Sequence, residues 1–289
     1  MNSQNKVKII TDTCCSLTKD RLEKMGVDYL QNTFMLEEKL FIGFDAFEES
    51  NEQFFENLKN VKNISTGCVN IQDAIDLFEK YAAEGVDVVY IGLSSGLSSS
   101  YNNVRLAADE INEKYGKKIW VADSLTGGNG LGKVVQEGVR LANEGKSAEE
   151  IFNILDKNGL KIISLFVPGD LIYLCRLGRL NKVVAGIGSL LKLSPIIAAD
   201  ENGKLKVLAK TIGRKKALAT LKEYLLKNAD LEKEETIFIG HTNQLQEAKE
   251  LEKFINDNMK NKTVEIDYID RTMGCHCGPE TIAIFASGK

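Results

Sequence analysis

The stretch VDVVYIG, residues 86–92, is the feature that most limits how this chain can fold. It is apolar at nearly every position and lacks the polar/apolar alternation of a strand with one face in water. Such strands are typical of parallel sheets that helices cover on both faces. The segment before it has the helical period, with one apolar face formed by Ile71, Ala74, Ile75, Phe78 and Ala82. The pattern therefore predicts a buried strand within an α/β sheet.

Strand and helix patterns alternate through the first half of the chain. VKIITDT and KKIWVADS are further strand candidates, so we predict an α/β domain with a parallel sheet over residues 1–158. Residues 28–43 are β-rich and could form a hairpin. The second half, residues 159–289, has more strand-like segments, and the ENG turn after SPIIAAD marks an antiparallel hairpin. We expect an α+β domain with a mixed sheet there, with helices near 170–192, 214–228 and 244–259.

Composition and charge exclude several classes of function. The net charge of −4 over 289 residues gives no electrostatic reason to expect nucleic-acid binding. No apolar run approaches the roughly 20 residues of a membrane span, and the first ten residues lack a signal-peptide core. The six cysteines show no disulfide framework and fit a reducing compartment. We expect a cytoplasmic monomer, and we leave a transient membrane contact open.

Small hydroxyl residues recur where strands are expected to give way to helices. The four junctions are Thr11-Asp12-Thr13, Ser65-Thr66-Gly67, Ser94-Ser95-Gly96 and Asp123-Ser124. In a parallel sheet such turns share the carboxyl edge, where these folds bind ligands. Free N–H groups at a helix start favour an anion. Each hydroxyl could instead be a helix cap, with Ser98 or Ser99 as the candidate before residue 100. The repetition favours a site for a phosphate or carboxylate.

Two other patterns suggest different chemistry. In GCHCGPE, residues 274–280, His276 stands between two cysteines, but adjacent positions suit a tetrahedral zinc site poorly, so we expect no metal. Cys14 and Cys15 precede a helix, where a thiolate nucleophile would be favoured. The glycines of GGNGLG do not have the spacing of a dinucleotide-binding loop.

Arg176, Arg179 and Lys182 are spaced three apart in YLCRLGRLNK, and on a helix they would share one face. A solvated helix face would explain this spacing. The alternative is a basic patch that grips a phosphate or an acidic partner.

Taken in order, several of these stretches resemble the DegV family of bacterial fatty-acid-binding proteins across essentially the whole chain. They are IITDTCCSL, ISTG, IGLSSGLSSSYNN, VADS, YLCRLGRLNK, GRKKAL, IGHTNQLQEA and MGCHCGPETIAIF. The resemblance implies two domains that clasp one long acyl chain in a buried tunnel. Burial of sixteen or eighteen carbons, at ~0.8 kcal/mol per CH₂, offers more than about 10 kcal/mol of gross stabilisation.

The resemblance also implies roles for individual residues. The fatty acid carboxylate would lie at the domain interface, held by Ser65, Thr66, Ser94, Ser95, the Gly96 backbone and His276, with Asp12 and Thr13 at the same polar end. In kinase-linked members a separate fatty acid kinase phosphorylates this carboxylate, and Arg176 and Arg179 match the basic segment expected to dock it.

The expected ligand is palmitate- or stearate-like, with no cofactor and no catalytic activity. Two alternatives stay open. One is a cysteine- or serine-dependent acyl hydrolase or transferase, and the other is a lipid-sensing regulator that works without a kinase.

Overall fold

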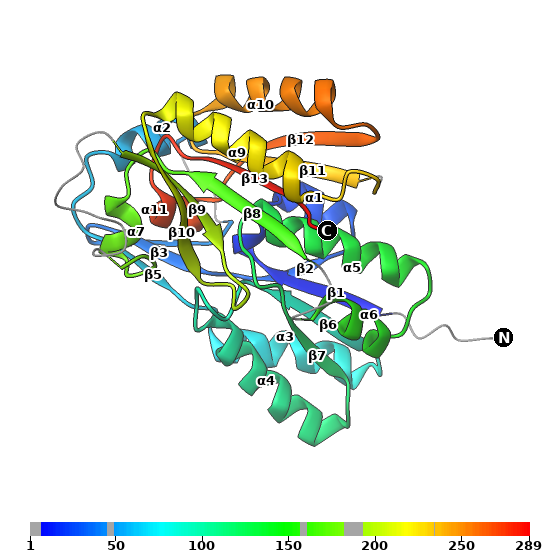
Figure 1. Cartoon of the computed structure of the whole chain (residues 1–289). Helices are drawn as coiled ribbons and strands as arrows, with labels where there is room; N and C mark the ends of the chain where they lie inside the picture. The colour runs from blue at the N-terminus through cyan, green and yellow to red at the C-terminus, as the bar shows by residue number, and fades with distance from the viewer. Residues whose placement is uncertain (1–6, 45–48, 157–160, 182–192, 234) are drawn as a thin grey trace.

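The parallel sheet expected in the first half is present in the computed structural model, which describes residues 7–44, 49–156, 161–181, 193–233 and 235–289. Its strands are ordered β2 (Asp28–Leu30), β1 (Val7–Asp12), β6 (Asp87–Gly92) and β7 (Ile119–Asp123), and every pair is parallel (Figure 1). The stretch VDVVYIG contributes β6, next to β1 in the interior of this sheet.

Helices cover both faces of this sheet, as the unbroken apolar pattern of β6 predicts. Val89 and Ile91 pack in one hydrophobic cluster with α5 (Asn129–Asn143) and α6 (Ala148–Leu155). Val88 and Tyr90 point the other way, into a cluster with α3 (Ile71–Ala83) and α4 (Ser100–Tyr115). The short helix α1 (Lys19–Lys24) follows β1, and the Thr18 hydroxyl caps it by accepting the Arg21 N–H.

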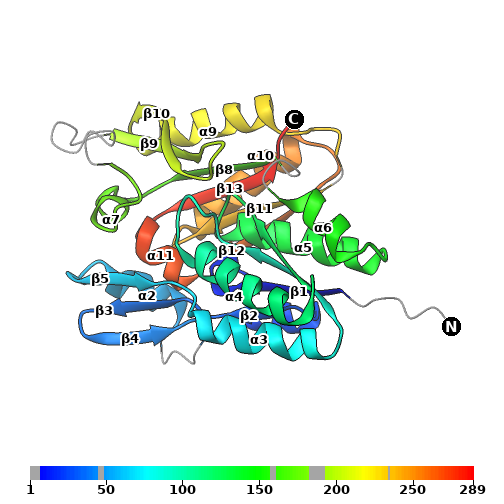
Figure 2. The same cartoon turned by 90° about the horizontal axis from the view of Figure 1, so that it is seen from below.

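A separate three-stranded antiparallel sheet lies beside the parallel one (Figure 2). The hairpin expected over residues 28–43 is there, as β3 (Thr33–Leu36) and β4 (Lys39–Ile42), and α2 (Asn51–Leu58) follows it. The third strand, β5 (Ile64–Gly67), pairs antiparallel with β3. The expectation that Ser65-Thr66-Gly67 lies at the carboxyl edge of the parallel sheet was therefore wrong. A strand's own residues do not specify which sheet it joins. Here β5 joins the open edge of β3 in the β3–β4 hairpin and not the parallel sheet.

The second half forms the mixed sheet that its sequence predicts. Its order is β10 (Leu205–Ile212), β9 (Leu193–Ala199), β8 (Ile162–Val167), β13 (Ile282–Ser287), β11 (Glu235–His241) and β12 (Lys262–Tyr268), in which only β11 and β12 pair in parallel. The β9–β10 hairpin at ENG is confirmed. Helices α9 (Arg214–Asn228) and α10 (Leu245–Asn258) pack against one face of this sheet, around a cluster that includes Leu221, Leu251 and Ile284.

One short helix, α7, differs from the sequence expectation, and another, α11, was not expected from the sequence. In the described part of the segment expected to be helical over 170–192, the helix is α7 (Ile172–Arg176), and the chain reverses after it at Gly178, whose φ is +73°. Arg176 and Arg179 therefore do not share a helix face. Residues 182–192, Lys182 among them, lie outside the described residues. Helix α11 (Arg271–Cys277) contains the GCHC motif.

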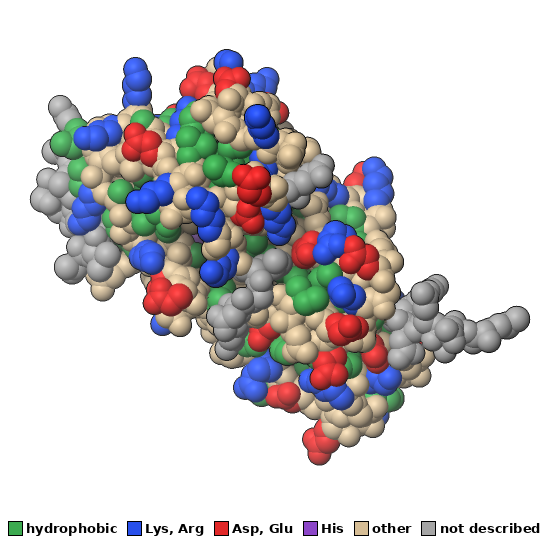
Figure 3. Space-filling model, turned by 45° about the vertical axis from the view of Figure 1, so that its right-hand side comes forward, with side chains coloured by type: hydrophobic (Ala, Val, Ile, Leu, Met, Phe, Trp, Pro, Cys, Tyr) green, Lys and Arg blue, Asp and Glu red, His purple; other side chains and the backbone are tan. Residues whose placement is uncertain are grey.

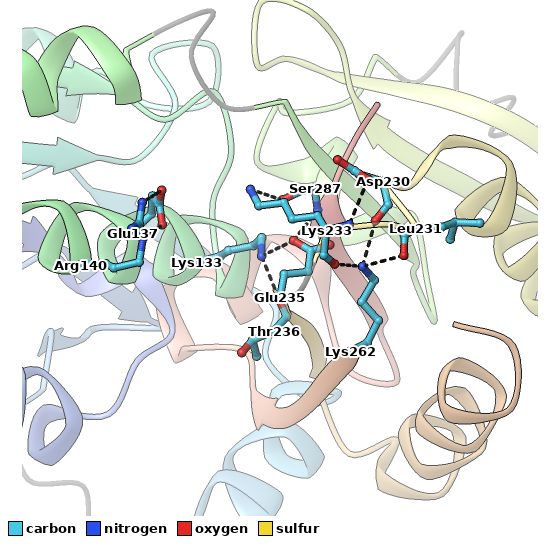
Figure 4. A network of polar contacts seen from close by, with 10 residues as sticks. All are labelled: Lys133, Glu137, Arg140, Asp230, Leu231, Lys233, Glu235, Thr236, Lys262 and Ser287. Atoms are coloured by element: carbon cyan, nitrogen blue, oxygen red, sulfur yellow. Dashed lines mark hydrogen bonds and ion pairs between the residues drawn. The ribbon is translucent and has the colours of Figure 1, made fainter. Parts of the chain in front are cut away.

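The two halves meet through α5. Its residues Leu131 and Val134 share one hydrophobic cluster with Phe238 of β11 and Phe285 of β13, so the core of the first half continues into the second. Beside this cluster, Lys133 Nζ lies 2.8 Å from Glu235 Oε2 and donates to the Thr236 carbonyl at 2.8 Å (Figure 4).

Outside the core, basic and acidic side chains are interspersed over the face shown in Figure 3. No helix in the described ranges is long and apolar enough to cross a membrane.

Candidate functional site

A narrow cavity runs between the two halves. It holds about 970 Å³ of space free of protein atoms, counting the part open to solvent, but only about 100 Å³ of this admits the centre of a water-sized sphere. Most of this space is thus too narrow for a water-sized sphere. Its apolar lining comes from both halves and includes Leu93, Leu97, Phe166, Leu174, Ala199, Leu205, Ile269, Met273, Ala283 and Phe285. Such a slot suits a thin, flexible apolar chain better than a flat ring system.

Strand alternation explains why the second sheet has an apolar face free for the cavity. On β13, Ala283 and Phe285 line the space, whereas Ile282 and Ile284 belong to the cluster under α9 and α10. On β8, Phe166 lines the space and Leu165 packs under the helices. Both faces of this sheet are therefore hydrophobic, but only one is filled by its own helices.

One end of the cavity is polar, and Thr66 and His276 form its centre. Thr66 on β5 places its Oγ1 3.0 Å from Nε2 of His276, in the last turn of α11. Burial, together with the positive charge of Arg179, lowers the pKa of His276 to about 3. The imidazole is neutral near pH 7, so it acts as a hydrogen-bonding group and not as a cation. Its Nδ1 is buried, with no hydrogen-bond partner within the described residues.

Helix α11 is held in place at its first turn. Asp270 caps it by accepting the Met273 N–H at 2.9 Å. The same carboxylate accepts the Ser16 hydroxyl at 2.7 Å, and Ser16 Oγ accepts the Asp270 N–H at 3.0 Å. This two-bond clamp ties the helix that carries His276 to the end of β1 in the other half. Burial, with the charge of Asp12, raises the pKa of Asp270 to about 7.

Ser98 and Cys68 extend the polar end. Both line the cavity, with 3.7 Å between Cys68 Sγ and Ser98 Oγ. Ser98 also accepts the Ser100 N–H at 3.1 Å, as a capping residue does. The sequence suggested only that capping role. Position Ser99, at the start of α4, makes no side-chain cap bond.

Arg179, which the family resemblance predicts to dock a kinase, also belongs to the cavity lining, and the docking role stays a prediction. Its Nε donates to the Leu97 carbonyl at 2.9 Å and its Nη1 to the Leu177 carbonyl at 2.5 Å. Among the described residues that line the cavity, Arg179 is the one basic side chain. Arg176, in contrast, is exposed and lines a neighbouring cleft together with Ser65, and this cleft holds about 790 Å³ of space free of protein atoms. Ser65 and Thr66 are successive residues of β5, so they point to opposite faces.

The junction Ser94-Ser95-Gly96 contacts the other half and does not line the cavity. Ser94 is buried, donates to the Gly203 carbonyl at 3.0 Å and accepts the Gly96 N–H at 3.1 Å. The loop at residues 202–203 can come this close because residue 96 is glycine, and a Cβ there would overlap the Asn202 carbonyl oxygen. Ser95 is exposed, and its N–H is bound by Asp123 at 3.1 Å.

Asp12 and Thr13 are buried behind the polar end and bond to protein groups. Asp12 accepts the N–H groups of Cys14 at 2.9 Å and Leu93 at 3.0 Å, and the Tyr90 hydroxyl at 2.8 Å. Burial raises its pKa. Thr13 Oγ1 accepts the Asn32 N–H at 3.0 Å. For Asp12, Thr13, Ser65, Ser94, Ser95 and Gly96, a role in ligand binding stays a prediction.

Sequence reasoning missed the hydroxyl residues on the cavity wall, Thr126, Ser164, Thr272 and Thr281. The alternation in IISLFV could have indicated Ser164, because it falls on the same strand face as Phe166. Cys14 and Cys277 also line the cavity, and burial raises the pKa of both thiols, to about 12 for Cys277. In the described part of the chain, no three His, Cys, Asp or Glu side chains could share a metal ion.

These features define a class: a two-part α/β protein with a narrow apolar slot that ends at neutral hydrogen-bonding groups. Residues 6–289 match the family described as "Uncharacterised protein, DegV family", and the chain belongs to that family. It is 32% identical over 284 residues to DegV domain-containing protein CPE0026 of Clostridium perfringens, covering 98% of both chains.

Solved structures share the fold. DegV from Bacillus subtilis, described as a fatty acid binding protein, has 25% identity and a TM-score of 0.83, covering 98% of this chain and 99% of the other. A DegV family protein from Thermus thermophilus, described by its fatty acid binding, has 19% identity and a TM-score of 0.85, covering 98% and 100%. The Streptococcus pneumoniae Fatty Acid Kinase (Fak) B3 protein, loaded with linoleic acid, has 21% identity and a TM-score of 0.82, covering 98% and 100%.

Proposed function

We propose that this protein is a non-enzymatic carrier. It holds one long-chain fatty acid in the cavity between its halves and presents the carboxylate to a separate fatty acid kinase for phosphorylation. The narrow apolar slot that ends at Thr66, His276, Ser98 and Arg179 is the observation that carries this proposal. The fatty acid binding named for the Thermus thermophilus and Bacillus subtilis proteins supports it, and so do the linoleic acid and the kinase system named for the Streptococcus pneumoniae protein.

The chemistry of the polar end fits a carboxylate. Thr66 supplies a hydroxyl group and Arg179 a positive charge at the same wall, whereas the Ser98 hydroxyl beside them donates to Ser100 Oγ at 3.0 Å. A buried carboxylate needs such partners, because an unpaired charge in an apolar site is strongly unfavourable. The acyl chain would then lie along Phe166, Ala283 and Phe285, where apolar burial stabilises it.

The same geometry gives little support to an acyl hydrolase or transferase. The Thr66–His276 contact has the form of a nucleophile and its base, but an imidazole with a pKa of about 3 is a poor base near pH 7. No described residue orients its Nδ1. The raised pKa of the Cys14 and Cys15 thiols opposes thiolate formation.

The proposal has two separable tests. Mass spectrometry of a denatured extract of the purified protein should release one long-chain fatty acid per chain, and the delipidated protein should take up palmitate or stearate. Lack of binding would contradict the carrier assignment.

The loaded protein with a purified fatty acid kinase and ATP should then yield acyl phosphate. Binding without this product would favour a lipid-sensing regulator, and release of free acid from an acyl ester would favour the hydrolase.

A further inference from the structure

A pair of hydroxyl groups interrupts the apolar wall of the cavity. Thr126 Oγ1 and Ser164 Oγ lie 2.8 Å apart, and both residues line the space. Thr126 comes from the loop between β7 and α5 in the first half, and Ser164 from β8 in the second half. The pair therefore bridges the two halves within the cavity wall.

Ser164 stands at a position where the strand pattern calls for an apolar residue. The neighbouring cavity-facing positions of β8 and β13 are Phe166, Ala283 and Phe285. Ser164 is the register partner of Phe285, so its hydroxyl sits among these side chains. An alanine or valine would fill this position without introducing a polar group into an apolar surface.

On the side of the second sheet, the pair lies further along β13 than the strand end that follows α11. Strand β13 begins at Ile282, shortly after α11, and Ser164 pairs with Phe285, three residues further along. At about 3.4 Å per residue, this puts Ser164 about 10 Å further from α11 than the start of β13. Figure 1 shows α7 and α11 at the same end of the molecule, from which β13 runs away toward the C-terminus. A fatty acid whose carboxylate is at His276 would pass Ser164 with the middle of its chain.

The pair has unused hydrogen-bonding capacity. Two hydroxyls bring two hydrogens, and their mutual bond uses only one. The second hydrogen has no acceptor within the described residues. Two other hydroxyls on the cavity wall do not provide a free hydrogen at this position. Thr281 donates its hydrogen to the Cys277 carbonyl at 2.8 Å, and Thr272 is one helical turn from His276 at the polar end.

We propose that the cavity is selective for long-chain fatty acids that carry a hydroxyl group near the middle of the chain. The ligand hydroxyl accepts the unused hydrogen of the Thr126–Ser164 pair and donates its own hydrogen to a lone pair of the same hydroxyls. This compensates for the loss of water that would otherwise exclude such a chain from an apolar slot. The inference rests on the proposed function, because it assumes that a fatty acid occupies the cavity.

The test measures dissociation constants of the delipidated full-length protein for stearate and for a mid-chain hydroxystearate. The wild-type protein should bind the hydroxystearate at least as tightly as stearate. Replacing both hydroxyls, with Thr126→Val and Ser164→Ala together, should leave stearate affinity within a few-fold and weaken hydroxystearate binding about tenfold or more. Ser287→Ala is a matched control, because Ser287 is a β13 hydroxyl outside the cavity lining.

Three results would count against the inference. The wild type could bind the hydroxystearate tenfold more weakly than stearate, as expected of a slot without a polar partner. The double variant could weaken both ligands equally, which would make the pair only a contact between the halves. A hydroxystearate with its hydroxyl at the end of the chain could bind as tightly as one with its hydroxyl at the middle. If the double variant does not fold, the wild-type ratio and Ser164→Ala alone decide. Failure of both acids to bind the wild type would instead overturn the proposed function.

Discussion

At the residue scale, Thr66 and Ser95 can be separated although both were predicted to hold the carboxylate. Thr66 lines the cavity and contacts His276, whereas Ser95 is exposed. We expect Thr66→Ala to weaken fatty acid binding by about 1–3 kcal/mol, because a buried carboxylate loses a donor. Ser95→Ala is the matched control and should bind normally in the same calorimetric titration. Equal losses in both variants would contradict the placement of the head group.

His276 should leave a signature in the pH dependence of stability. Its pKa is lowered to about 3 in the folded protein, whereas an unfolded histidine titrates near 6.5. The stabilisation is therefore present above pH 6.5 and is lost progressively as the pH falls toward 3. Between pH 6 and 5 the loss approaches about 1.4 kcal/mol per pH unit.

Urea unfolding of wild type and His276→Gln across this range measures the effect. The difference between the two proteins isolates His276, because burial also lowers the pKa of His241 and that contribution is common to both. Parallel stability curves for the two proteins would show that folding does not lower the pKa of His276.

At the scale of single elements, the clamp on α11 has the opposite pH dependence. The pKa of Asp270 is raised to about 7 from 3.8, so its stabilisation is complete below pH 3.8 and is lost as the pH rises toward and through 7. Asp270→Asn keeps an acceptor for the Met273 N–H but does not ionise. We expect the variant to gain stability relative to wild type between pH 5 and pH 8 in thermal unfolding. Asp20, an acidic residue in the first turn of α1, provides the control in Asp20→Asn. A constant offset between Asp270→Asn and wild type would refute the raised pKa.

Individual elements also show how far the sequence could predict the structure. The strand VDVVYIG, its covering helices and the ENG hairpin follow from local patterns, and they are confirmed. Local patterns could not predict which sheet β5 joins, because that choice depends on which strand edge the β3–β4 hairpin leaves open. Ser65 and Thr66 could not be distinguished without knowing which face of β5 meets α11. The position of Arg179 at the cavity wall could not be predicted, because it depends on the turn of the chain at Gly178, and its docking role stays a prediction.

At the scale of the whole molecule, the Lys133–Glu235 pair fastens α5 to the second sheet. The side chains are 13% and 4% exposed, so little solvent screens this contact. Lys133→Met should destabilise the protein by about 3–5 kcal/mol, because it leaves a buried carboxylate without its partner. Adding Glu235→Leu should recover much of that loss. Arg140→Ala removes an exposed pair on the same helix and should change stability by about 1 kcal/mol or less. Chemical denaturation compares these variants, and a loss from Lys133→Met no larger than that from Arg140→Ala would contradict the buried character of the pair.

The hydrophobic cluster that α5 shares with β11 and β13 has a consequence for how the protein melts. A boundary near residue 158 divides the chain by topology, but Leu131, Phe238 and Phe285 belong to one core. Heating should therefore produce a single cooperative transition, and neither half should fold when expressed alone. Since the cavity opens within the same packed region, the proposed acyl chain would complete that core, and we expect its binding to raise the melting temperature by mass action. The melting temperature of a purified batch then reports how much of it is loaded.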